Sequence, residues 1–230
     1  MFESKAGILF IGGIGFFVLA FVANGAVPML MYRDMPEQTA EQVVNANSLY
    51  QVEDLSRRFP DAFKKHVGDA TARPWDAAKW REVSAALLRE GRDVYVGEGC
   101  WHCHSQFVRP VSNESLRYGP VAKTEEYQNE LQRPVLFGTR RVGPDLSREG
   151  GRRSNDWHAA HFLNPPLLSP NSPMPRYTWF FDGDDASQPN RRGLAIMAYV
   201  QWLGSWLESY PYYEDYQPVD VLDPKPAATK

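Results

Sequence analysis

The apolar residues of the chain form one long N-terminal segment, followed by short groups with helical spacing. Residues 6–32 contain no charged side chain over 27 positions. An α-helix rises about 1.5 Å per residue, so about 20 apolar residues are enough to cross a bilayer. A cleaved secretory signal is the alternative, but the apolar core of a signal is shorter, about 7–15 residues. The pattern therefore predicts a single N-terminal transmembrane helix.

Beyond this segment, hydrophobic residues recur at helical spacing in four places. We expect helices near residues 37–58, from Pro74 to Leu88, from Ser154 to Phe162, and over residues 191–209. Most prolines fall in residues 105–190, which indicates loops joined by short helices. The part after the apolar segment is therefore predicted to be mainly α with long loops.

Composition and charge exclude several classes of protein. The net charge of the 230 residues is −3 and 23% of them are charged, so neither a nucleic-acid partner nor general disorder is expected. The chain has two cysteines, Cys100 and Cys103. Two cysteines three positions apart exclude a disulfide scaffold and are to be interpreted as one site.

The two cysteines belong to the sequence Cys-Trp-His-Cys-His at residues 100–104. C-x-x-C-H is the attachment signature of c-type haem, in which two thiols form thioethers to the vinyl groups and the histidine binds iron. A redox dithiol would be expected near a βαβ pattern, and structural zinc needs a second ligand pair; the sequence shows neither. We therefore expect one covalent haem c, held by Cys100, Cys103 and the iron ligand His104.

The second iron ligand can be sought among the six methionines by elimination. Four lie at the N-terminus or in and just after the apolar segment, and Met197 falls on the packing face of the last expected helix. Met174 remains, between two prolines that stiffen its loop. A Met/His pair raises the potential of a haem. Met174 is the predicted ligand, and bis-histidine ligation by His158 or His161 is the alternative.

Three segments resemble the class I cytochrome c domain. Residues 91–95 resemble the face on which the first helix of that family crosses the last, here residues 191–209. Residues 143–146, Gly-Pro-Asp-Leu, resemble a turn whose proline carbonyl accepts a hydrogen bond from the ligand histidine. The resemblance implies this role for Pro144 toward His104, where such a bond fixes the imidazole tautomer.

A basic stretch at residues 133–153 has six arginines and two acidic residues. One interpretation is a solvated loop surface. The functional interpretation places Arg140 or Arg141 on the haem propionates through charge-assisted hydrogen bonds.

A longer set of motifs resembles the mono-haem subunit, subunit II, of cbb₃-type cytochrome c oxidases. The resemblance covers the anchor and residues 88–208. The motifs that carry it, in chain order, are residues 98–110, 114–119, 143–146, 157–161, 172–175 and 198–203. Although C-x-x-C-H alone is generic, the full ordered set is specific to this subunit.

The resemblance implies a non-catalytic electron-transfer subunit that docks on a haem–copper catalytic subunit. Its electron donor would be another cytochrome c, either a subunit or a soluble protein, and its acceptor a b haem. The alternatives are the cytochrome c subunit of a nitric oxide reductase and, from another class, an anchored haem enzyme such as a peroxidase. The linker at residues 37–74 is longer than the family pattern and the C-terminal tail is additional, so oxygen and nitric oxide both stay open as terminal acceptors.

The location and the domain boundaries follow from this interpretation. Haem c is attached outside the cytoplasmic membrane, so the expected topology is single-pass, with a cytoplasmic N-terminus and a periplasmic haem domain. The expected segments are an anchor at 1–33, a periplasmic linker with helices at 34–90, a cytochrome c domain at 91–210 and an acidic tail at 211–230.

Overall fold

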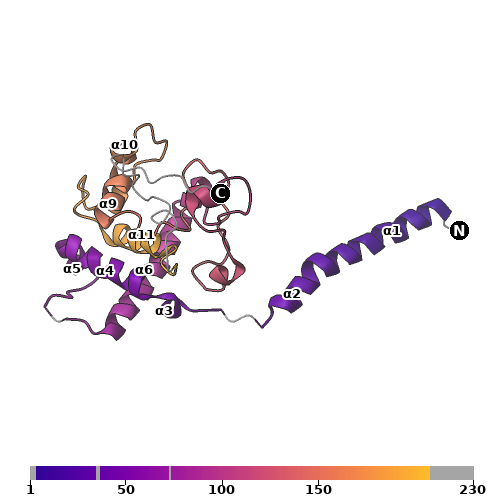
Figure 1. Cartoon of the computed structure of the whole chain (residues 1–230), viewed down its shortest axis with the longest axis horizontal. Helices are drawn as coiled ribbons and strands as arrows, with labels where there is room; N and C mark the ends of the chain where they lie inside the picture. Colours follow the sequence, from indigo (N-terminus) through magenta and orange to yellow (C-terminus); the bar gives the residue numbers. More distant parts are fainter. Residues whose placement is uncertain (1–3, 35–36, 73, 208–230) are drawn as a thin grey trace, which may run out of the picture. The chain divides into compact units, whose positions relative to one another are not determined.

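The chain divides into two units, Met1–Glu37 and Gln38–Lys230. The computed structural model describes residues 4–34, 37–72 and 74–207 (Figure 1). The tail predicted at residues 211–230, and the end of the helix predicted over residues 191–209, lie outside the described residues.

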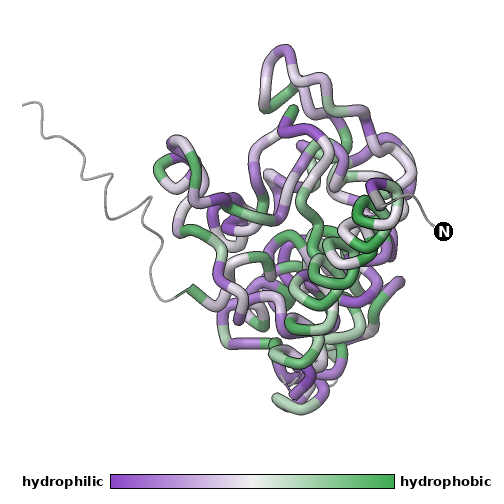
Figure 2. The backbone as a smooth tube through the Cα atoms, turned by 90° about the vertical axis from the view of Figure 1, so that its right-hand side faces the viewer, coloured by the Kyte–Doolittle hydropathy of each residue, from purple (hydrophilic) through white to green (hydrophobic). Residues whose placement is uncertain are grey.

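The first unit is a helix that runs through α1 (Ser4–Phe21), a π-turn η1 (Val22–Ala26) and α2 (Val27–Tyr32). Pro28 lies in the first turn of α2. Proline has no N–H to donate and its ring crowds the carbonyl four residues earlier, which favours the wider π-turn before it. The segment Lys5–Tyr32 is long and apolar enough to cross a membrane, and Figure 2 shows it as largely hydrophobic. It fits the predicted single-pass anchor.

The second unit is mainly helical, as the sequence predicts, and no strand occurs among the described residues. Besides two isolated bridges, its regular elements are α3 (Ala40–Val43), α4 (Ala46–Arg58), α5 (Pro60–His66), α6 (Ala77–Gly97), α7 (Cys100–Cys103), α8 (Glu114–Tyr118), η2 (Thr124–Tyr127), α9 (Asn155–Leu163), α10 (Pro165–Leu168), η3 (Thr178–Phe180) and α11 (Arg191–Trp202). Loops connect most of the elements between α7 and α11.

Helices α6 and α11 cross in the hydrophobic core. A Cβ atom on Gly91 would lie 2.1 Å from the carbonyl oxygen of Ala195, so the two backbones touch and only glycine fits. Next to this contact the rings of Tyr95 and Tyr199 pack with centroids 5.6 Å apart. The helix crossing implied by the class I cytochrome c resemblance is therefore present, and it fixes the end of α6 that leads into the Cys100–Cys103 turn.

Helices α3, α4 and α5 lie in the region for which a linker with helices was predicted, and they are part of the same core. Val52, Leu55, Phe59 and Phe63 are almost fully buried in the hydrophobic cluster that includes α6 and α11. Burying a side chain of this size contributes about 1.5–3 kcal/mol. The predicted boundary at residue 90 therefore separates segments that share one core.

Three predicted helix boundaries shift for local reasons. The helix expected over residues 37–58 is divided, because Asn45 forms a capping box that starts α4 afresh. The second helix starts at Ala77, since the Asp76 carboxylate accepts a hydrogen bond from Lys79 N at 2.7 Å. The last helix ends at Trp202, before Gly204 takes a left-handed φ of 83°. The helix predicted from Ser154 is confirmed as α9, with Ser154 as its N-cap.

Candidate haem-binding site

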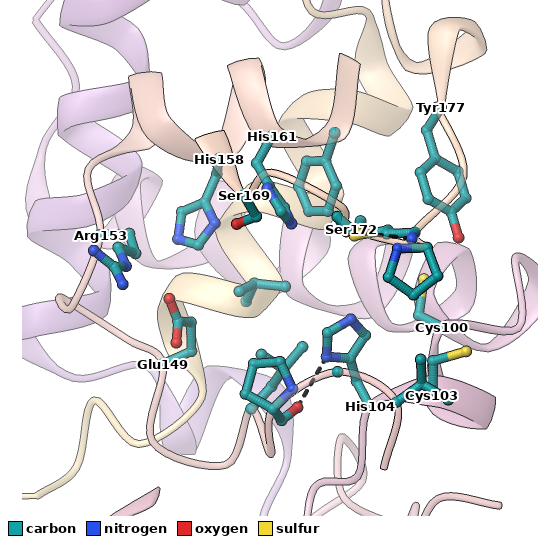
Figure 3. A pocket seen from close by; sticks show the side chains of 18 of the residues that line it. Cys100, Cys103, His104, Glu149, Arg153, His158, His161, Ser169, Ser172 and Tyr177 are labelled. Carbon is teal, nitrogen blue, oxygen red and sulfur yellow. Dashed lines mark hydrogen bonds between the residues drawn. The ribbon is translucent and has the colours of Figure 1, made fainter. Parts of the chain in front are cut away.

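The second unit contains a cavity of about 490 Å³ between two walls (Figure 3). We call one the His104 wall, formed by residues 100–106 and 143–147. The other is the Met174 wall, formed by α9 and residues 169–175. Cys100, Cys103, His104, Pro144 and Met174 all line the cavity. The fold thus brings these five predicted site residues together from three separate segments of the chain.

The C-x-x-C-H motif lies on a single helical turn at the end of α6. Gly99 adopts a left-handed φ of 70°, which turns the chain out of α6 and into α7. Both cysteines are free thiols, and burial raises the pKa of the Cys100 thiol to about 12. A redox dithiol needs a cysteine whose pKa is lowered, so this environment does not favour that alternative.

The imidazole of His104 is oriented by its own wall. His104 Nδ1 lies 2.9 Å from the carbonyl oxygen of Pro144, which can only accept, so Nδ1 carries the proton (Figure 3). Burial lowers the pKa of His104, which keeps the ring neutral. A Cβ on Gly143 would come within 2.1 Å of the ring, so the turn packs tightly against it. Nε2 is left with a free lone pair, the form in which a histidine binds iron.

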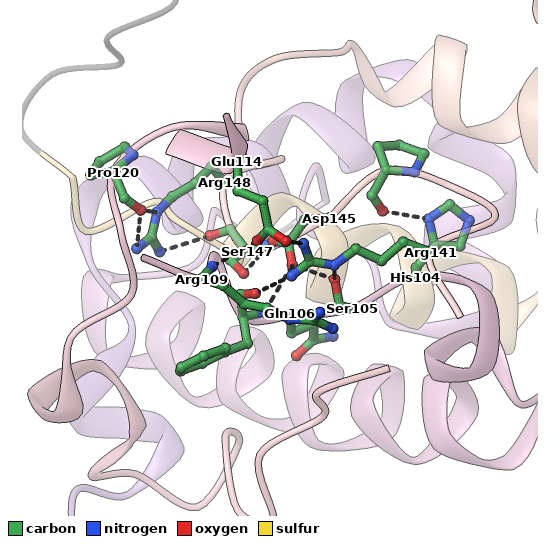
Figure 4. Close-up of polar contacts among 12 residues, drawn as sticks. His104, Ser105, Gln106, Arg109, Glu114, Pro120, Arg141, Asp145, Ser147 and Arg148 are labelled. Carbon is green, nitrogen blue, oxygen red and sulfur yellow. Dashed lines mark hydrogen bonds and ion pairs between the residues drawn. The ribbon is translucent and has the colours of Figure 1, made fainter. Parts of the chain in front are cut away.

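Behind His104, a polar network holds the motif against the turn (Figure 4). Asp145 is 1% exposed and accepts hydrogen bonds from Ser105 Oγ at 2.5 Å and from Phe107 N at 2.9 Å. Arg141 donates from Nε to Ser105 Oγ at 2.6 Å and forms an ion pair with Glu114. A buried carboxylate needs several such partners, so the network holds the backbone on both sides of His104.

Neither Arg140 nor Arg141 lines the cavity. Arg141 is engaged in the network behind His104, and the side chain of Arg140 is exposed. The predicted contact of these arginines with propionates is therefore not favoured by the geometry. The arginines that line the cavity are Arg117, Arg152 and Arg153.

Met174 lies on the opposite wall, in a loop with few hydrogen bonds. Its backbone N donates to Ser172 Oγ at 3.3 Å, and its side chain packs partly against the core. Met197, which the sequence assigned to packing, is fully buried in the core on α11. The two methionines therefore occupy different environments, and Met174 is the one that faces the cavity.

The two histidines of α9 also line the cavity and have polar atoms without a partner among the described residues. His158 is 3% exposed, and its Nε2 makes no hydrogen bond. His161 stacks on Trp157 with ring centroids 4.5 Å apart, and its Nδ1 also lacks a partner. Burial lowers the pKa of His158 to about 3 and that of His161 to about 4. Both rings are neutral, and a buried polar atom without a partner points to a ligand.

One end of the cavity is charged, which the sequence did not indicate. We call it the Glu149 end, formed by Glu149, Arg152 and Arg153 beside His158 (Figure 3). These residues belong to the basic stretch at residues 133–153, and Glu149 is one of its two acids. Charge pattern alone could not select them, because the path of the loop decides which arginines line the cavity.

The residues around the cavity fit a haem. The lining combines two free thiols, a neutral histidine, a thioether and apolar groups, with charged groups at one end. Within the described residues, no cluster of three or more His, Cys, Asp or Glu side chains could hold a metal ion by itself. This donor set suits a macrocycle that brings its own iron and does not suit a zinc site.

Comparison with known protein families decides the assignment. Residues 76–203, more than half of the chain, match the family described as cytochrome c oxidase, mono-heme subunit/FixO. The chain belongs to this family. The predicted resemblance to the mono-haem subunit of cbb₃-type oxidases is thereby confirmed. A comparison with curated proteins gives no match.

Membership of the FixO family establishes the general role of the chain. Its members are mono-haem subunits of a cytochrome c oxidase complex, so the chain is an electron-transport component of a respiratory chain with a haem cofactor. A catalytic subunit and a membrane are implied as partners. The matched segment starts at Asp76, the N-cap of α6, and ends just after α11. It therefore includes both walls of the cavity but not α3–α5.

Proposed function

We propose that the chain carries one haem c in the cavity and relays single electrons from a cytochrome c donor to a b haem of the catalytic subunit. The donor is another cytochrome c subunit or a soluble cytochrome c, and the catalytic subunit is of the haem–copper type. The observation that carries the proposal is that Cys100, Cys103, His104 and Met174 line one cavity.

Each of these residues has one role. Cys100 and Cys103 would form thioethers to the haem, which would prevent its dissociation. His104 would bind iron through Nε2, because Nδ1–H donates to Pro144. Met174 would supply the sulfur ligand from the opposite wall. The bound haem supplies one-electron exchange between ferric and ferrous iron.

A relay role follows from the ligand set. If His104 and Met174 both hold the iron, no position would remain for oxygen, nitric oxide or peroxide, which argues against the peroxidase alternative. Both cysteines are used for attachment, so neither remains as a nucleophile. The match to an oxidase family favours the oxidase over the nitric oxide reductase alternative.

The same attachment chemistry sets the topology that we propose. Haem c is attached outside the cytoplasmic membrane, so the second unit lies in the periplasm and the N-terminus in the cytoplasm. The helix Lys5–Tyr32 then anchors the chain in the inner membrane with a single pass.

The test compares the chain alone with the complete oxidase complex. After reduction, the isolated chain should be reoxidised by oxygen slowly, and the complex should be reoxidised fast. A complex with Cys100→Ala/Cys103→Ala should lose oxidation of a cytochrome c donor but still oxidise an artificial donor that reduces the catalytic subunit directly. Fast reoxidation of the isolated chain, at the rate of the complex, would contradict the relay role.

A further inference from the structure

The Glu149 end lies opposite the two cysteines across the cavity. In Figure 3, Cys100 and Cys103 are at one side, whereas Glu149, Arg153 and His158 gather at the other. In the haem macrocycle, the vinyl groups and the propionates occupy opposite edges. If the vinyl edge is bonded to the cysteines, the propionates must point toward the Glu149 end. This step rests on the proposed function, because it assumes a haem attached at Cys100 and Cys103.

The backbone of this end is fixed by α11. Gly150 N donates to the carbonyl oxygen of Leu203 at 2.7 Å, and Gly151 N donates to Gln201 Oε1 at 2.9 Å. Gln201 Nε2 in turn donates to the carbonyl oxygen of Arg153 at 2.9 Å. The charged side chains are therefore attached to a segment held in place by the core, which makes the Glu149 end a built site.

The Glu149 end contains cationic and hydrogen-bonding groups that can bind carboxylates. Arg153 lies over the Trp157 ring at 5.0 Å, and an Arg152 nitrogen is 3.7 Å from a Glu149 oxygen. Nε2 of the buried His158 has no hydrogen-bond partner among the described residues. In the tautomer with the proton on Nε2, a propionate oxygen could accept from Nε2–H and pair with an arginine, which would satisfy a buried donor that is otherwise costly.

The position of Glu149 needs an explanation of its own, because its side chain is a carboxyl group at the end where the propionate carboxylates are expected to bind. It is 6% exposed, and burial raises its pKa to about 7, although Arg152 and Arg153 oppose this shift. Two ionised propionates would balance the charges of Arg152 and Arg153, which leaves no positive charge for an ionised Glu149. Like charges at close range are avoided when one carboxyl keeps its proton.

We propose that the Glu149 end binds the haem propionates, and that Glu149 is the protonated acid in the reduced protein, gaining its proton when the haem is reduced and losing it when the haem is oxidised. On reduction, one electron arrives from the cytochrome c donor and one proton comes from solvent. An O–H bond then forms at a Glu149 Oε, and reoxidation reverses both transfers. The charge of the site is thus kept nearly constant.

Other ionisable groups near Glu149 do not replace it in this role. Facing it are Arg152 and Arg153 from its own loop and His158 from α9, while α11 presents Ile196 and Val200 to the cavity. The arginines stay charged at all relevant pH values, and His158 stays neutral because burial lowers its pKa to about 3. The remaining ionisable side chains that line the cavity are Tyr95, Cys100, Cys103, His104, Arg117, Tyr118, His161 and Tyr177.

The test is a redox titration of the purified full-length haem protein in detergent, from well below to well above neutral pH. The midpoint potential should fall as pH rises through neutrality, because ionised Glu149 stabilises ferric iron. The slope cannot exceed about 59 mV per tenfold change in proton concentration for one electron and one proton. Glu149→Gln should abolish the slope in this range, and Glu149→Asp should retain one. The control Glu82→Gln, which removes an exposed acid on α6, should behave as wild type.

A second variant tests the interaction between Arg153 and Glu149. Arg153→Gln removes a positive charge that favours ionised Glu149, so the pH range of the slope should move upward. If the pH range of the slope did not move, the proposed interaction between Arg153 and Glu149 would be contradicted. If Glu149→Gln does not mature, redox difference infrared spectroscopy of the wild type serves instead. Reduction near neutral pH should produce the C=O band of a protonated carboxyl, and its absence would overturn the proposal.

The failures of the two proposals can be told apart in the same samples. A slope that persists in Glu149→Gln, with covalent haem and the ligand spectrum intact, overturns only the role of Glu149. Absence of covalent haem from the wild-type chain overturns both the proposed function and this inference.

Discussion

The two walls of the cavity differ in how completely the protein satisfies its own polar groups. On the His104 wall, the ligand ring donates to Pro144, the His104 carbonyl accepts from Tyr95 at 3.0 Å, and Ser105 donates to buried Asp145. On the Met174 wall, His158 Nε2 and His161 Nδ1 have no partner among the described residues. The protein itself therefore satisfies the polar groups of one wall, whereas the other wall leaves two buried nitrogens for a ligand.

This difference bears on the proposed covalent attachment of a haem. The proposed attachment would require the thiols and His104 to be placed correctly, and hydrogen bonds from Gly143 N to Cys103 O and between His104 and Pro144 hold this segment in place. The loop at residues 169–175 is stiffened by prolines and has few hydrogen bonds. Variants on the two walls should accordingly fail in different ways.

The largest effect is expected at the attachment points. Cys100→Ala/Cys103→Ala should abolish covalent haem, because no other thiol exists in the chain. A haem stain after denaturing electrophoresis measures this directly. His102→Ala is the control: His102 is an exposed spacer within the same motif, so covalent haem should remain. Covalent haem in the double variant would remove the basis of the site.

The next effect tests the rigidity of the His104 wall. Gly143→Ala would place a methyl group 2.1 Å from the His104 ring, so the ring or the turn must shift. Overpacking of this kind costs about 1–3 kcal/mol. Optical spectra should show weakened histidine ligation, and thermal unfolding should occur at lower temperature.

Gly97→Ala is the matched control for Gly143→Ala. Gly97 ends α6 in open space, and alanine is the better helix former by about 1 kcal/mol. Gly97→Ala should leave the optical spectrum unchanged, and its thermal unfolding should occur at the same or a slightly higher temperature than in the wild type. Equal behaviour of the two alanine variants would show that the turn at residue 143 is not tight.

The corresponding change on the Met174 wall should affect the iron and spare the fold. Met174→Leu removes the sulfur at nearly constant volume, a swap that costs less than about 1.5 kcal/mol. The weak sulfur-to-iron absorption band of the oxidised protein should disappear, and the midpoint potential should fall. Met197→Leu, in the core of α11, should keep both. A band that survives in Met174→Leu would assign the sulfur ligand to another methionine, and a wild-type protein without the band would have His158 or His161 as the ligand.

The contrast between the walls also shows what the sequence could predict. The His104 wall is encoded locally: C-x-x-C-H fixes three ligating groups within five residues, and the Gly-Pro turn supplies the partner of His104. Helix α9 was predictable because Ser154 caps it and accepts from Trp157 N at 3.1 Å. Elimination among six methionines selected Met174, and the structure places it in the lining of the cavity; its role as a ligand stays a prediction.

Two features were not predicted, for different physical reasons. The burial of Val52, Leu55, Phe59 and Phe63 follows a helical spacing that the sequence does contain, but the surrounding polar residues concealed it. The Glu149 end could not be recognised, because the placement of its arginines at the cavity depends on hydrogen bonds from residues 150 and 151 to residues 201 and 203 at the end of α11. Such long-range contacts leave no local pattern.

The smallest effect is expected at Arg140, which the sequence placed beside the propionates. Its side chain is exposed and does not line the cavity, although its backbone N donates to the carbonyl oxygen of His102 at 2.9 Å. Arg140→Gln keeps that backbone bond, so the free energy of unfolding should change by no more than about 0.5 kcal/mol. The pH dependence of the midpoint potential should also stay as in the wild type.

Arg141→Gln is the companion variant to Arg140→Gln and should have a measurable effect on stability, because Arg141 belongs to the network behind His104. Loss of its ion pair with Glu114 and its bond to Ser105 should cost about 1–3 kcal/mol, measured by thermal unfolding in detergent. The pH dependence of the potential should nevertheless persist, since Glu149 and Arg153 are unchanged. If instead either variant abolished that dependence while Arg153→Gln left it untouched, the propionates would lie at Arg140 and Arg141. The haem would then be oriented as the basic stretch alone suggested.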